Sequence, residues 1–222
     1  MRVATYNIRH ASLKGLGAIR TVLDSLGADL VGLQEVDRHV VRSGVEDQAR
    51  WLGEALGMEA RFGPAMHLDG GEYGVALLSR FPIVGHRVHP LPSQFEPRIA
   101  LDCTVVVPEG PPWKVVVTHL GLHPLERWEQ MEELLRLHGN EERLLLLGDL
   151  NETRTEEGFA RLRARWVDCV AEAGVDLVTY PAEHPVIGID HVLRSHALPP
   201  ATFARAVSTQ ASDHLPVAVE LG

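Results

Sequence analysis

The sequence predicts an α/β fold, in which apolar strands alternate with amphipathic helices. The clearest strand is Leu144–Asn151, LLLLGDLN, because an unbroken apolar run between charged residues and a glycine is typical of a strand buried on both faces. A strand–helix–strand pattern occurs twice, at 2–8, 14–26 and 29–35, and at 113–119, 124–138 and 144–151. The recurrence indicates two similar halves. No polar linker separates them, so we expect one domain over residues 1–222.

The composition is that of an ordinary globular chain, with 45% hydrophobic and 23% charged residues. The formal net charge of −9 disfavours tight non-specific binding to nucleic acid, although a bound cation could reverse the sign locally at a phosphate site. No run reaches the roughly 20 apolar residues of a membrane span. The N-terminus lacks a signal-peptide core, and the two cysteines are too few for a disulfide framework. We therefore expect a cytoplasmic protein, and a monomer.

The first half of the chain alternates regularly between helical and strand patterns. Apolar residues at helical spacing from Leu13 to Leu26 predict a helix that ends at Gly27. The other expected elements are strands at 2–8, 29–36, 58–62 and 74–79, an edge strand at 82–89, a helix at 46–56, and loops at 37–46 and near 69–71.

The second half contains the buried strand 144–151. An apolar stripe over 124–138 predicts the helix before it, and Thr155–Val170 is predicted as the helix after it. The remaining expected elements are a strand pair at 98–107 and 113–119, a loop at 176–185, and strands at 187–193, 202–207 and 215–221.

Polar side chains stand at the ends of these strands or in the adjoining loops. Asp149 and Asn151 are two positions apart, which places both on one face if the strand continues through them; an Asx turn at the strand end is the alternative. The full set is Asn7, Glu35, His119, Asp149 with Asn151, Asp190 with His191, and Asp213 with His214. Each residue alone has a structural explanation. Together they suggest one functional rim, because active sites on α/β sheets gather at strand ends.

The ordered motifs TYNIR, LQEVD, GVALLSRFPI, THL, GDLN, IDHVL and SDHLPV resemble the endonuclease/exonuclease/phosphatase superfamily. They run from residue 5 to residue 217 and so cover nearly the whole chain. LQE and SDH are weak signals alone, whereas GD-x-N followed by SDH-x-P-V is specific. The resemblance implies a four-layer sandwich of two packed mixed β-sheets flanked by helices. It also implies an enzyme that hydrolyses phosphoester bonds with a divalent metal ion.

The resemblance assigns a metal-binding role to Asn7, Glu35 and Asp213. Their carboxylate and amide oxygens are hard ligands suited to Mg²⁺ or Mn²⁺. No cysteine–histidine spacing points to structural zinc. We therefore expect Mg²⁺ or Mn²⁺ as the cofactor.

The same resemblance implies roles for the other rim residues. Asp149 would orient or deprotonate the attacking water, and Asn151 would hold the nucleophile or the phosphoryl group. His119 and His214 would donate hydrogen bonds to phosphate oxygens, and one of them could act as general acid. Asp190 would orient His214 and favour its protonated form. His191 is expected to be structural.

The substrate is less clearly indicated. Arg98 is a candidate phosphate contact, with a structural salt bridge as an equal alternative. Glu72 is a tentative substrate contact; it and Tyr73 could face the substrate or support His119. The chain is short for a repair nuclease and has no basic, aromatic-interleaved stretch. We therefore expect a small substrate or a lipid headgroup. A DNA or RNA nuclease is the alternative, and a catalytically inactive binding module is a third reading that the complete residue set disfavours.

Overall fold

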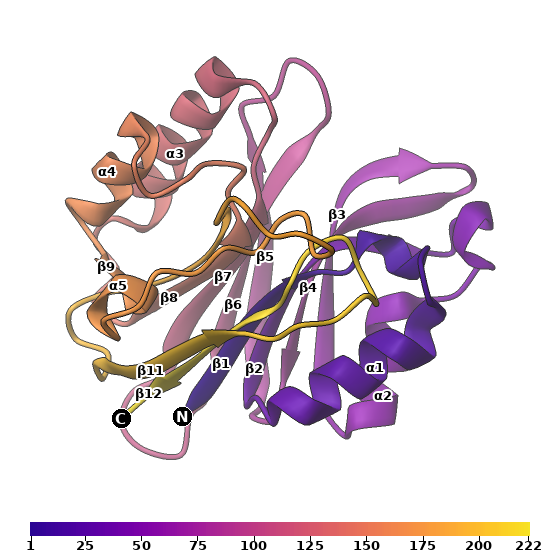
Figure 1. Ribbon diagram of the computed structural model, residues 1–222, viewed down its shortest axis with the longest axis horizontal. Helices are drawn as coiled ribbons and strands as arrows, with labels where there is room; N and C mark the ends of the chain where they lie inside the picture. The colour runs from indigo at the N-terminus through magenta and orange to yellow at the C-terminus, as the bar shows by residue number, and fades with distance from the viewer.

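Two mixed β-sheets of six strands each pack face to face in the computed structural model, which describes residues 1–222 (Figure 1). Helices α1 (Gly15–Leu26) and α2 (Gln48–Leu56) cover the outer face of the first sheet. Helices α3 (Pro124–His138) and α4 (Glu157–Arg163) cover the outer face of the second. The predicted four-layer sandwich is confirmed.

The two sheets have the same arrangement of parallel and antiparallel strands. The first runs in the order β11 (Ala201–Ala206), β12 (Val217–Leu221), β1 (Arg2–Asn7), β2 (Leu30–Arg38), β4 (Gly71–Ser79), β3 (Glu59–Leu68). The second runs in the order β5 (Ile83–Leu91), β6 (Arg98–Val105), β7 (Trp113–His119), β8 (Leu144–Asp149), β10 (Asp190–Arg194), β9 (Val167–Asp168). In both, one parallel pair, β1 with β2 or β7 with β8, lies at the centre. The recurrence predicted from the sequence is therefore present as two matching half-domains.

The leucine run of β8 is explained by the layers. Leu145 and Leu147 belong to the cluster of 24 buried residues between the two sheets. Leu144 and Leu146 belong to the cluster of 13 buried residues under α3 and α4. Side chains alternate across a strand, so a strand with an apolar core on each face needs apolar residues at every position.

Several predicted boundaries were wrong, most clearly the helix over Thr155–Val170. The chain instead forms α4, then β9, then the short helix α5 (Cys169–Glu172). Asp168 interrupts the helix because its Oδ1 accepts hydrogen bonds from the N–H groups of Val170 and Ala171, at 3.0 and 3.3 Å, and so starts α5. Strand β8 ends at Asp149, β10 begins at Asp190, and β3 continues to Leu68.

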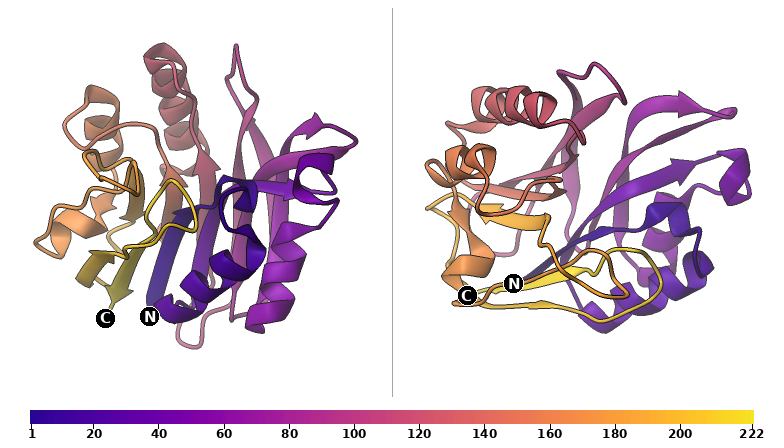
Figure 2. Two further views of the ribbon diagram at one scale, coloured as in Figure 1. Left: turned by 45° about the vertical axis from the view of Figure 1, so that its right-hand side comes forward. Right: turned by 45° about the horizontal axis from the view of Figure 1, so that its top comes forward.

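The carboxyl ends of β1, β2, β7 and β8 meet at one rim of the sandwich, and two segments cross beside it. Figure 2 shows the orange chain near residue 180 running beside the yellow chain near residue 213. The N–H of Ala182 donates to the carbonyl of Asp213 at 2.7 Å, and that of Leu215 donates to the carbonyl of Thr179 at 2.8 Å. The two termini lie together at the opposite end (Figures 1 and 2). None of the helices is both long and apolar enough to span a membrane.

Candidate active site

Asn7 connects the two sheets at the rim. It is fully buried at the end of β1, and its Nδ2 donates to Oε1 of Glu35 and to Oδ2 of Asp149, both at 3.0 Å. Its Oδ1 accepts the N–H of Arg9 at 3.0 Å, which fixes the orientation of the amide. Asn7 therefore holds a carboxylate from each sheet in one place.

Glu35 reaches the rim because the backbone of β2 is irregular there. The pairing of β2 with β4 shifts between Leu33 and Val36, and Glu35 has a φ of 54°, in the left-handed region. A bulge of this kind redirects a side chain out of the normal strand alternation, at a cost in backbone strain. No arginine or lysine pairs with Glu35. The nearest basic group is Nδ1 of His10 at 3.9 Å, and burial lowers the pKa of that histidine.

Asp149 and Asn151 do come together, through a turn. Asn151 lies beyond the end of β8 with a φ of 50°, and its N–H donates to Oδ1 of Asp149 at 3.0 Å. This is the Asx turn that was the alternative to a continued strand. The turn also places Nδ2 of Asn151 3.2 Å from Nε2 of His119. The same Nδ2 of Asn151 donates to the carbonyl of Leu120 at 2.9 Å.

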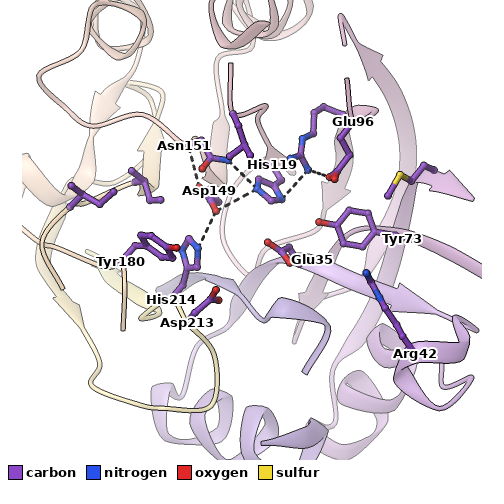
Figure 3. A pocket seen from close by; sticks show the side chains of 15 residues that line it. Glu35, Arg42, Tyr73, Glu96, His119, Asp149, Asn151, Tyr180, Asp213 and His214 are labelled. Atoms are coloured by element: carbon purple, nitrogen blue, oxygen red, sulfur yellow. Dashed lines mark hydrogen bonds and ion pairs between the residues drawn. The ribbon is translucent and has the colours of Figure 1, made fainter. Parts of the chain in front are cut away.

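Two histidines flank Asp149. Oδ2 of Asp149 lies 3.5 Å from Nε2 of His119 and 3.6 Å from Nε2 of His214 (Figure 3). Burial, together with the charges of Arg98 and His214, holds the pKa of His119 well below its usual value. Burial also lowers the pKa of His214, but the carboxylates of Asp190, Asp149 and Asp213 outweigh it and raise this pKa to about 10. At neutral pH the site therefore contains one neutral and one protonated imidazole.

Asp190 fixes the ring of His214 and contributes to its raised pKa. Its Oδ2 lies 3.0 Å from Nδ1 of His214, and it faces Asp149 in register across β8 and β10. Burial and the charge of Asp190 raise the pKa of Asp149 to about 7, although His214 and Asn7 act in the opposite direction. His191, the next residue, bonds to the carbonyl of Glu152 at 2.7 Å, away from this cluster.

The acidic residues at the rim fit a hard divalent cation. Glu35 and Asp213 keep side-chain exposures of 25% and 28%, and only Arg9, at 3.4 Å, pairs with Asp213. Ligand atoms of Asp149, Asp190 and His214 also lie within 4.8 Å of one another, but in that cluster the protonated His214 already supplies the positive charge. Oxygen donors with unbalanced negative charge suit Mg²⁺ or Mn²⁺, whereas both cysteines are buried in the apolar core between the sheets. In this arrangement Asn7 presents its nitrogen to the carboxylates, while its oxygen faces Arg9.

These residues open into a cavity of about 420 Å³. Its lining consists of Glu35, Arg42, Met66, Tyr73, Glu96, Arg98, His119, Leu122, Asp149, Asn151, Tyr180, Ile187, Ile189, Asp213 and His214 (Figure 3). Asn7 and Asp190 lie behind this lining, each bonded to a residue in it. The structure therefore brings the predicted metal-binding and catalytic residues together.

The two tentative substrate contacts have different positions. Arg98 lines the cavity, with Nη1 2.6 Å from Oε1 of Glu96 and 3.3 Å from Nδ1 of His119, so the expected salt bridge is present as well. Glu72 does not line the cavity, which corrects the expectation of a substrate contact. It forms an ion pair with Arg38 on the neighbouring strand. Because side chains alternate along β4, its neighbour Tyr73 points into the cavity instead.

Arg42 and Tyr180 were missed by the sequence reasoning. Arg42 lies in a short 3-10 helix, Val41–Ser43, and Tyr180 in the segment before β10, and neither stretch has a recognisable motif. The ring of Tyr180 lies 4.8 Å from that of His214, tilted by 44°. No local pattern signals either residue, because the folding of these segments over the rim brings them to the site.

A model of the endonuclease/exonuclease/phosphatase family matches residues 4–214. The chain belongs to this family. The match includes every strand-end residue described above, from Asn7 to His214.

Relatives of known structure support the same fold for this family member. An endonuclease/exonuclease/phosphatase from Beutenbergia cavernae superimposes with a TM-score of 0.80 at 24% identity, covering 100% of this chain and 72% of the other. The catalytic domain of human Nocturnin with bound sulfate superimposes with a TM-score of 0.73 at 20% identity, covering 99% of this chain and 93% of the Nocturnin chain. In sequence, the chain is 38% identical to Schizosaccharomyces pombe protein cwh43 over 122 residues, which are 54% of this chain and 12% of that much longer protein.

Proposed function

We propose that this family member is a Mg²⁺- or Mn²⁺-dependent phosphoesterase that hydrolyses a phosphodiester or phosphomonoester by in-line attack of water. Members of the family are hydrolases that act on phosphoester bonds. The observation that carries the proposal is the position of Asp149 between His119 and His214, 3.5 and 3.6 Å away, in one cavity with Glu35 and Asp213.

Asp149 is suited to accept a proton from water. A general base works best when its pKa lies near the operating pH, and burial raises the pKa of this carboxyl to about 7. The N–H of Asn151 and the amide of Asn7 hold both of its oxygens in place. The side chain of Asn151 would help to orient the phosphoryl group.

His214 is suited to stabilise the negative charge that develops on the phosphate oxygens. Asp190 keeps its imidazole protonated and fixes the ring, and a preorganised cationic donor gains strength when it is buried. His119 would donate a second hydrogen bond from the opposite side. Glu35 and Asp213 would hold the cation, and the amide nitrogen of Asn7 would orient the carboxylate of Glu35. The cation would neutralise phosphate charge and stabilise the leaving oxygen.

For the substrate we propose a small phosphoester or a lipid headgroup. The net charge of −9 disfavours a long nucleic-acid interface, because phosphate backbones need many basic contacts. A DNA or RNA nuclease acting through the same residues is the second candidate. A cytoplasmic location and a monomeric state remain predictions.

The direct test is hydrolysis of bis-p-nitrophenyl phosphate and of p-nitrophenyl phosphate with Mg²⁺, with Mn²⁺ and with EDTA. The proposal expects turnover of at least one compound that EDTA abolishes and added metal restores. Turnover that is unaffected by EDTA would contradict metal dependence. Plasmid DNA, glycerophosphodiesters and dispersed phospholipids, tested in parallel, separate the substrate classes.

A further inference from the structure

Arg42 is held at the cavity wall by an unusual buried support. Its Nε and Nη2 donate to the two carboxylate oxygens of Asp37, each at 2.9 Å, and the side chain of Asp37 is fully buried. The backbone N–H of Asp37 is bonded in turn to Gln48 at 2.9 Å, and Gln48 donates to the carbonyl of His10 at 2.8 Å. This network fixes the guanidinium in a single orientation.

Only two of the three guanidinium nitrogens of Arg42 bond to Asp37. Its third nitrogen, Nη1, makes no hydrogen bond to the protein, and the side chain, 37% exposed, lines the cavity. Its guanidinium carbon lies 5.4 Å from the ring centroid of Tyr73. Figure 3 shows Arg42 and Tyr73 on the side of the cavity beyond Glu35, away from His214. A structural salt bridge alone would not require the arginine to face the cavity.

Arg98 also lines the cavity, between Tyr73 and His119. Its side chain is only 6% exposed, it lies beside Tyr73, and its Nε is buried without a hydrogen-bond partner. Its nearest carboxylate is Glu96, which is 42% exposed on a loop. The oxygen of Glu96 that contacts Arg98 is buried, but the rest of this side chain is open to solvent, so a substrate anion that makes the same contact can displace it. A buried guanidinium with an unused donor and a displaceable carboxylate is well suited to receive an anion from the substrate.

We propose that Arg42, Tyr73 and Arg98 form a second anion subsite, which binds a phosphate or carboxylate of the substrate other than the phosphoester that is cleaved. The inference rests on the proposed function, because it places the cleaved group between Asp149, His119 and His214. The substrate class is then a small phosphoester with an additional anionic group. Glu96 occupies the position of that group on Arg98 when no substrate is bound.

The test compares two compounds that cannot be hydrolysed, methylphosphonate and propane-1,3-bisphosphonate. Calorimetric titration of the Mg²⁺-loaded protein should show at least about tenfold tighter binding of the bisphosphonate. Arg42→Gln should bring the ratio of the two affinities close to one. The matched control is Arg50→Gln, which removes an arginine that is 76% exposed and paired only with Glu54.

Arg42→Gln leaves the buried Asp37 without its partner, so its folding must be checked. The double variant Asp37→Asn/Arg42→Gln removes both charges together and should show the same loss of preference. Glu96→Gln should raise bisphosphonate affinity, because it removes the competing carboxylate. If methylphosphonate binds in a Mg²⁺-dependent way but the second phosphonate adds nothing, the subsite is wrong and the proposed function stands. If neither compound binds, both are overturned.

Discussion

Asp149 and Asp190 face each other in register on neighbouring antiparallel strands, with both side chains buried. Two carboxylates at such a position repel each other unless a cation lies between them. His214 supplies it, with Nδ1 3.0 Å from Asp190 and Nε2 3.6 Å from Asp149. The cluster thus holds a protonated imidazole between two buried carboxylates.

Asp190→Asn tests whether Asp190 acts through His214. We expect kcat to fall about 10- to 100-fold, because the imidazole loses the carboxylate that orients and protonates it. In a double-mutant cycle, His214→Asn should cost much less in the Asp190→Asn background than in the wild type. The control is Asp102→Asn in β6, which removes a carboxylate that pairs with Lys114 and does not line the cavity. Fully additive losses would show that Asp190 does not act through His214.

Glu35→Ala tests the metal assignment. Loss of this carboxylate should raise the Mg²⁺ concentration needed for half-maximal hydrolysis by at least about tenfold, since one carboxylate supplies much of the charge in an Mg²⁺ site. The measurement is a metal titration of diester hydrolysis, with Glu54→Ala as a control at an exposed position. An unchanged titration curve would remove Glu35 from the ligand set.

Asp168→Ala should destabilise the fold without touching the site. Asp168 caps α5 and pairs with Nε of Arg154 at 2.9 Å, and its side chain is 3% exposed. We expect a loss of about 2 kcal/mol in the free energy of unfolding, combining a lost cap with a broken buried pair. Asp176→Ala removes the other partner of Arg154, which is 90% exposed, and should cost under about 0.5 kcal/mol. Urea denaturation compares the two, and equal losses would contradict the capping account.

His138 should make stability depend on pH. Burial lowers its pKa to about 4 in the folded chain, so between that value and about 6.5 the unfolded chain binds the extra proton. Stability is therefore lost as the pH falls through this window. His138→Gln should reduce the slope by up to about 1.4 kcal/mol per pH unit. Urea denaturation at several pH values measures the slope, with the exposed His184→Gln as control, and an unchanged slope would contradict the account.

The sequence was sufficient to predict the convergence of the site. Carboxyl ends of parallel strands lie at the same edge of a sheet, so His119 and Asp149, which pair in register on β7 and β8, had to be neighbours. The leucine run predicted a strand buried on both faces, and β8 does have an apolar core on each face. The motif order then placed Asn7 and Glu35 on the matching strands of the other half.

The sequence could not predict features that depend on tertiary contacts. Glu35 reaches the rim only through a bulge, which no local pattern signals. Thr155–Val170 has helical periodicity, but Asp168 is buried against Arg154 and caps a new helix, so tertiary pairing overrides propensity. Arg42 and Tyr180 enter the site from connecting segments whose paths are set by distant strands.

In the proposed reaction, Asp149 prepares the attacking water at a shared rim of two sheets. The most direct measurement is Mg²⁺-dependent hydrolysis of bis-p-nitrophenyl phosphate by Asp149→Ala, with circular dichroism to verify its fold. The account predicts an unchanged spectrum and a rate at least about 10³-fold below wild type. A folded Asp149→Ala variant with the wild-type rate would contradict it.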